Sequence, residues 1–165
     1  MKKNYRSRLL YVTQAGIIAA LYFVFSYIPI FPIHLFELRA GEALCILPFF
    51  FPAAIPGLTI GCVLTNWLHA MPWQDVVFGS LATLIGALGA YLLRKISPWL
   101  IPIPTVLANA LILPPVFILA YGDESALWFL ILQVGGGEIL SAYILGMVLL
   151  FALRRVPERL FRPQT

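Results

Sequence analysis

The chain has 165 residues, of which 61% are hydrophobic and only 11% are charged, and its mean hydropathy is +0.93. This composition is far more apolar than a water-soluble domain of this length requires, so it predicts an integral membrane protein. One span takes about 20 apolar residues, so six spans would use about 120 and leave roughly 45 for tails and loops. That remainder excludes a soluble domain for nucleotide hydrolysis, signalling or nucleic-acid binding. The net charge of +4 forms no basic patch among exposed polar residues, so we expect no nucleic-acid partner.

Charged and proline-rich breaks divide the chain into apolar segments at residues 9–29, 42–54, 56–70, 74–93, 100–121 and 127–153. We interpret these as six transmembrane helices of one all-α domain covering residues 1–165. The first segment is too long for a signal peptide and lacks a small-residue cleavage site, so we expect it to be a retained span. The second segment is short and contains Pro48 and Pro52, with Pro56 in the turn beyond, so we expect it to be kinked or tilted.

The positions of the lysines and arginines predict the topology, because basic loops are retained on the cytoplasmic side. Ten of the eleven basic residues fall on one side if an even number of spans lies between 9 and 93 and another even number between 100 and 153. Four plus two spans satisfy this condition. The sequence therefore predicts a multi-pass membrane protein with both termini cytoplasmic. Arg39 alone breaks the pattern, which makes it a candidate functional residue.

Polar residues within the apolar segments form a second pattern, because a charged group in a span costs about 2.5 to 3.5 kcal/mol and usually faces a cavity or a partner. In the predicted topology most of them converge on the outer side: Arg39, Glu42, Asn66, Trp73, Asp75, Gln133 and Glu138. Asn109 is the main polar exception in the inner half. Glu138 is the strongest ligand candidate, because it lies deep and follows three glycines that allow close backbone approach. A polar pocket open to the outside suits the binding subunit of an importer.

Each of these residues also has a structural interpretation. Arg39 and Glu42 are three residues apart and could pair at a helix end, and Asp75 could cap or favourably charge a helix N-terminus. The amides could instead join helices by hydrogen bonds: Asn66, Asn109 and Gln133. The tryptophans near the outer interface could form an aromatic belt, with Trp73 the best candidate for stacking on a ligand: Trp67, Trp73 and Trp128.

Small residues recur at the four-residue spacing that permits close helix contact. In the first segment they are Ala15 with Ala19 and Gly16 with Ala20; later segments contain Gly57 with Gly61, and the series Ala82, Gly86 and Ala90. Packing within the chain is sufficient to explain the later segments. The first segment could instead present its small-residue face to another subunit.

The sequence contains no GxxxxGK[ST] loop, no HExxH and no GxSxG. His34 and His69 lack metal-ligand spacing and are expected to be interfacial residues, and we expect Cys45 and Cys62 to be free thiols. We therefore expect no catalytic residue, no metal and no cofactor. An intramembrane enzyme and a purely structural subunit stay open as alternatives to a binding subunit.

Four stretches of the chain resemble the QueT family of queuosine-precursor transporters. They read LRAGEALCILPFFFPAAIPGLTIGCVLTN, WQDVVFGSLATLIGALGAYLLRK, LANALI and QVGGGEILSAYILG, and the likeness covers most of residues 10 to 150. The resemblance implies a six-helix substrate-binding S component of an energy-coupling factor (ECF) transporter, which is a type of ABC importer. It also implies a 7-deazaguanine cargo, namely queuine or its aminomethyl (preQ1) or cyano (preQ0) precursor base. An S component for a different vitamin is the alternative within this class.

The resemblance also implies a location in the plasma membrane and a set of partners: a transmembrane coupling subunit and two ATPases. Ala15, Gly16, Ala19 and Ala20 occupy the place where S components dock to the coupling subunit. A deazaguanine edge presents two donors that one carboxylate can accept together, and a carbonyl that an amide can donate to. We therefore expect Glu138 to accept the donor edge and Gln133 or Asn66 to bind the carbonyl. Asp75 or Glu42 would neutralise an aminomethyl group.

Overall fold

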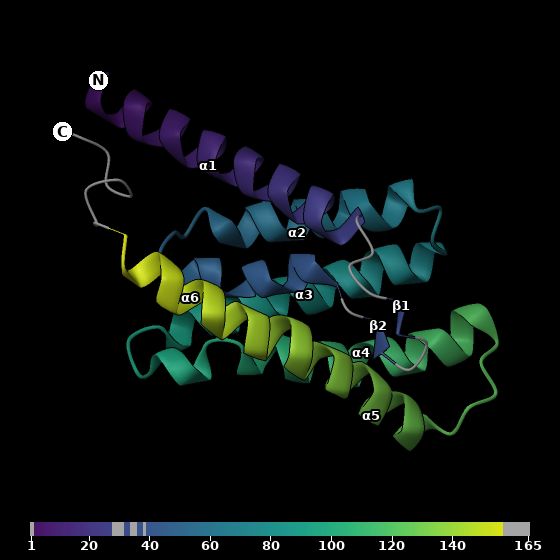
Figure 1. The fold of residues 1–165 in the computed structure, drawn as a ribbon. Helices are drawn as coiled ribbons and strands as arrows, with labels where there is room; N and C mark the ends of the chain where they lie inside the picture. The colour runs from purple at the N-terminus through teal and green to yellow at the C-terminus, as the bar shows by residue number, and fades with distance from the viewer. Residues whose placement is uncertain (1, 28–31, 34–35, 38, 157–165) are drawn as a thin grey trace.

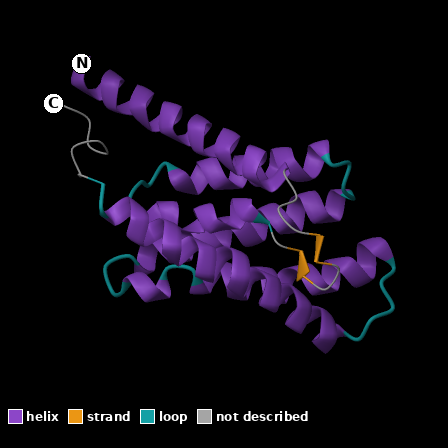
Figure 2. Ribbon diagram, in the orientation of Figure 1, coloured by secondary structure: helices purple, strands orange, loops and turns teal. Residues whose placement is uncertain are grey.

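The computed structural model describes residues 2–27, 32–33, 36–37 and 39–156. Almost all of this part of the chain is helical (Figures 1 and 2). In chain order the elements are α1 (Lys2–Tyr27), β1 (Pro32–Ile33), β2 (Phe36–Glu37), η1 (Ala40–Phe49), α2 (Ala54–Leu68), α3 (Trp73–Leu93), η2 (Pro98–Leu100), α4 (Ile103–Tyr121), α5 (Leu127–Glu138), η3 (Ile139–Leu145) and α6 (Gly146–Arg154). In the described ranges, the only strands are β1 and β2, which pair antiparallel with Pro32 opposite Glu37.

Within the described ranges, four helical stretches are long and apolar enough to cross a membrane: Ser7–Tyr27, Trp73–Leu93, Pro98–Tyr121 and Leu127–Arg154. The predicted second and third spans correspond to η1 and α2, which are shorter apolar helices. Ten residues of 3₁₀-helix rise about 20 Å and 15 residues of α-helix about 22 Å, less than the roughly 30 Å hydrocarbon layer. The structure is thus a helical membrane bundle in which four of the six predicted spans have spanning length.

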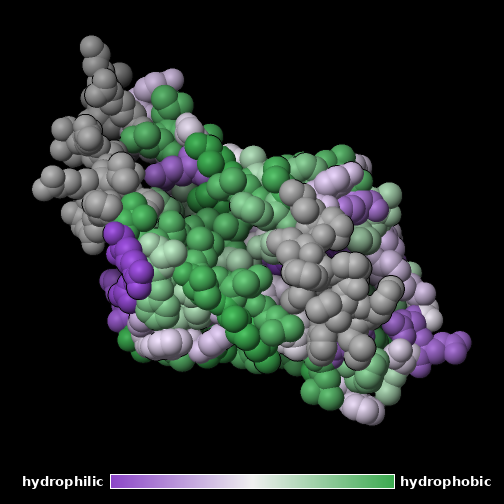
Figure 3. Space-filling view, in the orientation of Figure 1, coloured by the Kyte–Doolittle hydropathy of each residue, from purple (hydrophilic) through white to green (hydrophobic). Residues whose placement is uncertain are grey.

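The arrangement of the ends agrees with an even number of crossings. The N-terminal end of α1, the α3–α4 connection and the C-terminal end of α6 lie at one end of the bundle, and the α4–α5 connection lies at the other (Figure 1). Many large apolar side chains are exposed along the helices. In the view of Figure 3 they cover the middle of the molecule, while hydrophilic residues gather toward its ends. This distribution is expected of a surface that contacts lipid.

The prolines shape the short second segment differently from the prediction. Pro48 lies inside η1, which is a 3₁₀-helix, whereas Pro52 lies in the turn that follows it. Pro56, expected in a turn, is the third residue of α2. Proline is accommodated in a first helical turn because the backbone N–H groups there have no partner within the helix.

Glycines on α2 allow α1 to pack closely against it. A Cβ at Gly57 would lie 2.8 Å from the backbone oxygen of Ala15, and a Cβ at Gly61 would lie 2.8 Å from the Cβ of Tyr22. Ala15 and Ala19 are buried in this contact. Packing within the chain, predicted for Gly57 and Gly61, is confirmed, and it uses half of the small residues on the first helix.

The last three elements, α5, η3 and α6, form one continuous helical stretch of 28 residues. The glycine triplet before Glu138 does not interrupt α5. The helix instead widens into the π-helix η3 directly after Glu138. Single turns of π-helix are uncommon and often lie beside functional sites.

Candidate ligand-binding site

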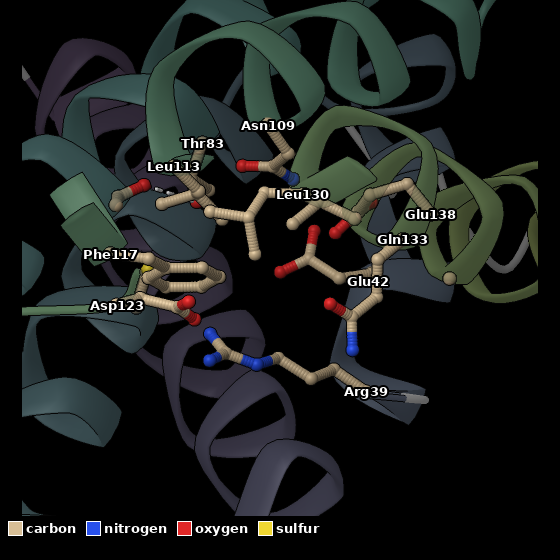
Figure 4. A pocket seen from close by; sticks show the side chains of 14 residues that line it. Arg39, Glu42, Thr83, Asn109, Leu113, Phe117, Asp123, Leu130, Gln133 and Glu138 are labelled. Atoms are coloured by element: carbon tan, nitrogen blue, oxygen red, sulfur yellow. Dashed lines mark hydrogen bonds between the residues drawn. The ribbon is translucent and has the colours of Figure 1, made fainter. Parts of the chain in front are cut away.

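A cavity of about 160 Å³ lies among η1, α2, α3, α4 and α5 (Figure 4). Five of the eight residues predicted to bind substrate line it: Arg39, Glu42, Asn109, Gln133 and Glu138. Arg39 directly precedes η1, and Glu42 lies in the first turn of that helix. Asn109 was expected apart from the others, in the inner half, but the middle of α4 brings it to the same cavity. The tertiary structure therefore gathers most of the predicted polar set around one space.

Two buried carboxylates are the main chemical feature of the cavity. Glu42 is 3% exposed and Glu138 is 8% exposed. Their carboxylates point toward one another across the cavity (Figure 4). Glu42 accepts a hydrogen bond from the hydroxyl of Tyr22 on α1. Sequence reasoning missed Tyr22, because nothing in an apolar helix distinguishes a tyrosine that bonds to the site from one that only packs.

Glu138 is not satisfied in the same way. Its Oε2 is buried and has no hydrogen-bond partner among the described residues. A buried polar atom without a partner costs about 1 to 3 kcal/mol, and more when the group is charged. Such an atom facing a cavity is suited to accept hydrogen bonds from a bound molecule.

Arg39 and Asp123 form the less buried side of the cavity. Both are partly exposed, and in Figure 4 the guanidinium and the carboxylate point toward one another beside the ring of Phe117. Hydrogen bonds from the Ser125 hydroxyl and from its backbone N–H, 2.8 Å from Oδ1, hold the pKa of Asp123 below its usual range. Asp123 lies between α4 and α5 and was not among the residues predicted to bind substrate.

One local feature of the sequence could have indicated that Asp123 lies near the site. Gly122 precedes it and ends α4 in the left-handed conformation, with φ of +66°. Glycine after a helix commonly ends it in this way. The chain then turns back toward α5, which places Asp123 over the cavity.

Two predicted residues lie in a separate hydrogen-bonded group, which we call the Asn66–Asp75 cluster. Asn66 and Asp75 are buried, and neither is among the residues that line the cavity. The Asn66 amide lies 3.3 Å from the backbone oxygen of Asp75 and donates to it, while the Tyr121 hydroxyl donates to Asp75 Oδ2 at 2.9 Å. The cluster thus joins α2, α3 and α4, as the interhelical interpretation of Asn66 expects. Asp75 lies in the first turn of α3, as the interpretation of a favourable charge at the helix N-terminus expects, and the N-cap residue of that helix makes no side-chain hydrogen bond.

Trp73 is also outside the described lining of the cavity and is 68% exposed. Trp67 and Trp128 are similarly exposed. They lie at the end of α2 and at the starts of α3 and α5, which is where the aromatic-belt interpretation places them. The arrangement therefore favours an interfacial position for Trp73 over stacking on a molecule in this cavity.

The remaining predictions concern the histidines and the cysteines. His69 is exposed and stacks on Tyr27 with the ring centroids 4.9 Å apart, while His34 lies outside the described residues. Cys45 and Cys62 are free and buried, as predicted. Over the ranges that the structure describes, no three histidine, cysteine or acidic side chains are grouped so that they could hold a metal ion.

Much of the cavity wall could not be predicted from the sequence. It consists of small and apolar residues together with one threonine: Cys62, Gly79, Thr83, Leu113, Phe117, Leu130, Val134 and Gly137. Such residues are common throughout every apolar segment of this chain. Only the packing of the helices selects which of them meet.

The fold and the cavity define a multi-pass helical membrane protein with an internal polar site. The chain belongs to the QueT transporter family, whose sequence profile matches residues 12–155. It is therefore a member of a family of transporters rather than of enzymes. No curated protein and no solved structure matches the chain.

Proposed function

We propose that this protein is the substrate-binding S component of an ECF-type importer and that its cargo is a queuosine precursor, a 7-deazaguanine base. The observation that carries the proposal is the cavity with two facing buried carboxylates, one of which has an oxygen without a hydrogen-bond partner among the described residues. Membership of the QueT transporter family supports the transport role. The deazaguanine is the ligand class that the family resemblance implies.

The chemistry of the cavity suits such a base. Glu138 would accept hydrogen bonds from the N1–H and the exocyclic amine of the base, since a carboxylate can accept two parallel donors. The neighbouring amides of Asn109 and Gln133 would donate to its carbonyl oxygen. Asn66 and Asp75 are less suited to these roles, because they hydrogen-bond to the protein outside the cavity.

The cavity encloses a volume the size of one aromatic ring and is open on one side. A protein cavity of about 150 Å³ encloses a benzene-sized molecule, and this one measures about 160 Å³. A substituted bicyclic base would place its donor edge at Glu138 and its substituent beside Glu42, and it would extend toward the partly exposed side, where Arg39 and Asp123 lie.

Membrane topology and partners complete the proposal. We propose that η1 and α2 also cross the membrane, which gives six membrane crossings and places both termini in the cytoplasm. A transmembrane coupling subunit and two ATPases would supply the energy. Ala15 and Ala19 are covered by α2, whereas Gly16 and Ala20 are exposed on the same helix. Docking to the coupling subunit is therefore assigned to the face that carries Gly16 and Ala20.

The cargo is tested by titrating the purified full chain in detergent with queuine, its aminomethyl and cyano precursor bases, and guanine. We expect submicromolar binding of at least one deazaguanine and much weaker binding of guanine. A Glu124→Gln variant is the matched control for a Glu138→Gln variant, because it removes an exposed carboxylate outside the cavity lining. Folded protein that bound none of these bases would reject the deazaguanine cargo, and a panel of vitamins would then test the other S-component specificities.

The partners are tested separately by co-expressing the chain with candidate coupling and ATPase subunits and purifying it through a tag. We expect all three partners to co-purify. A Gly16→Val variant should disrupt this association, because a Cβ at Gly16 meets no described atom within 4 Å beyond the backbone of its own helix and would project from the face that carries Gly16 and Ala20. Retention of the complex by that variant would argue against docking through this face.

A further inference from the structure

Tyr22 connects the cavity to a helix that contributes nothing to its described lining. The side chain is 2% exposed and reaches from α1 to the carboxylate of Glu42 on η1. Gly61 on α2 makes room for it, since a Cβ there would lie 2.8 Å from the Cβ of Tyr22. The tyrosine is therefore held by packing on one side and by a hydrogen bond on the other.

The hydrogen bond restricts what Glu42 can do. Tyr22 donates to Oε1, so one oxygen of the Glu42 carboxylate is already engaged within the protein. Glu42 differs in this respect from Glu138, for which no hydrogen bond to a described residue engages Oε2. A carboxylate with one oxygen engaged is suited to a single contact with a compact cation rather than to a pair of parallel donors.

The surroundings of Glu42 favour a cation there. The cavity contains Glu42, Glu138 and Asp123 against one arginine, Arg39. Two like-charged carboxylates that face each other repel, and a positive group between or beside them removes that cost.

We propose that Tyr22 is a positioning residue that holds Glu42 as the subsite for a positively charged substituent of the ligand, so that the protein prefers cationic over neutral forms of its cargo. This inference rests on the proposed function, because the site and the ligand class are the same. It assigns a specificity role to a residue of α1, the same helix on which the docking face lies.

The experiment compares two ligands that share the deazaguanine ring and differ in charge at one position. The 7-aminomethyl base carries an ammonium group, and the 7-cyano base is neutral. Binding of both is measured by calorimetry with wild-type protein, Tyr22→Phe, Glu42→Gln and the double variant. Tyr11→Phe is the matched control, since it removes an exposed hydroxyl from the same helix.

We expect wild-type protein to bind the aminomethyl base at least about tenfold more tightly than the cyano base, as one charge-assisted hydrogen bond is worth about this factor. Tyr22→Phe should weaken binding of the aminomethyl base about tenfold and of the cyano base less than about threefold. In the Glu42→Gln background, Tyr22→Phe should change the affinity for the aminomethyl base less than about twofold, because Tyr22 acts through Glu42. Tyr11→Phe should match wild type.

Three results would overturn the inference. They are equal affinity of wild-type protein for the two bases, an equal loss for both bases in Tyr22→Phe, and an undiminished effect of that change in the Glu42→Gln background. If Tyr22→Phe does not fold, Glu42→Gln alone decides, and a retained preference for the aminomethyl base overturns the inference. Binding of deazaguanines without a charge preference rejects this inference only, whereas binding of none by folded wild type also rejects the proposed cargo.

Discussion

Two polar groups lie buried in the same bundle, and they differ in how their hydrogen bonds are satisfied. In the Asn66–Asp75 cluster the amide and the carboxylate are bound by partners on neighbouring helices, at 3.3 Å and 2.9 Å. In the cavity Glu138 retains a buried oxygen without a described partner. Gly79 lies between the two, since a Cβ there would approach the Asn66 amide to 2.9 Å and Gly79 itself lines the cavity.

The difference separates structural from ligand-binding polar residues. A satisfied group contributes to helix packing, and removing it should lower stability. An unsatisfied group beside a cavity costs stability in the free protein, and a ligand that supplies the missing donors recovers that cost. The following variants are chosen to break or sharpen this distinction.

The largest effect is expected from Glu138→Gln. The amide can accept only one of the two donors of the base edge and carries no charge, so affinity should fall about 10- to 100-fold, or roughly 1.5 to 3 kcal/mol. The thermal unfolding temperature of the free protein should stay the same or rise, because the variant removes a buried acid whose Oε2 has no hydrogen-bond partner among the described residues. Titration calorimetry and a thermal-shift measurement check both. A large drop in stability with unchanged affinity would place Glu138 among the structural residues.

Gly61→Val tests the packing that carries Tyr22 to the cavity. The new side chain would collide with the Cβ of Tyr22 and the backbone oxygen of Ala19, at 2.8 and 2.9 Å. Overpacking of this kind costs about 1 to 3 kcal/mol, and we expect a lower unfolding temperature together with weaker ligand binding. Gly16→Val is the control and should unfold like wild type, since its Cβ meets no atom within 4 Å. Equal unfolding temperatures for the two variants would contradict the packing described for α1 and α2.

One amide from each group provides a reciprocal test. Asn66→Ala should lower stability by about 0.6 to 1.7 kcal/mol, the range measured for hydrogen bonds between membrane helices, with less than a threefold change in affinity. Gln133→Ala should have the reverse effect. It should lower the ligand affinity several-fold with little change in unfolding temperature, because Gln133 lines the cavity and is only partly buried. Identical profiles for the two variants would remove the distinction between the groups.

The smallest effect is expected from Asp123→Asn. Its pKa is lowered by the hydrogen bonds from Ser125, so the carboxylate stays charged well below neutral pH. The stabilisation of the loop is therefore present above the unfolded pKa and is lost only as the pH falls through the lower folded pKa. Between pH 5 and 8 the ligand-binding profile of the variant should have the same shape as that of wild type. A change of shape in this window would show that Asp123 titrates there.

Particular residues illustrate how far the sequence alone reaches. Glu138 and Glu42 could be predicted, because a charged residue in an apolar segment is rare and costly. The spans that became α1, α3, α4 and the α5–α6 stretch could also be predicted, because hydropathy over about 20 residues is a local property. The lengths of η1 and α2 were harder to predict from the sequence, because prolines and a 3₁₀-helix shorten that region.

Other assignments required contacts between distant segments. Tyr22 and Asp123 join the site from outside the predicted set, whereas Asn66, Asp75 and Trp73 do not line it. The small residues of α1 divide between the contact with α2 and the exposed face, although their sequence spacing is the same.

The sequence by itself determined that this is a helical membrane protein of the QueT transporter family with costly polar groups in its interior. Composition and motif carry that information because membrane insertion depends on each segment separately. Only the tertiary structure decided which polar groups are satisfied by the protein and which face a cavity. The physical reason is that a hydrogen bond between helices depends on how their faces meet, and the residues that meet lie far apart along the chain.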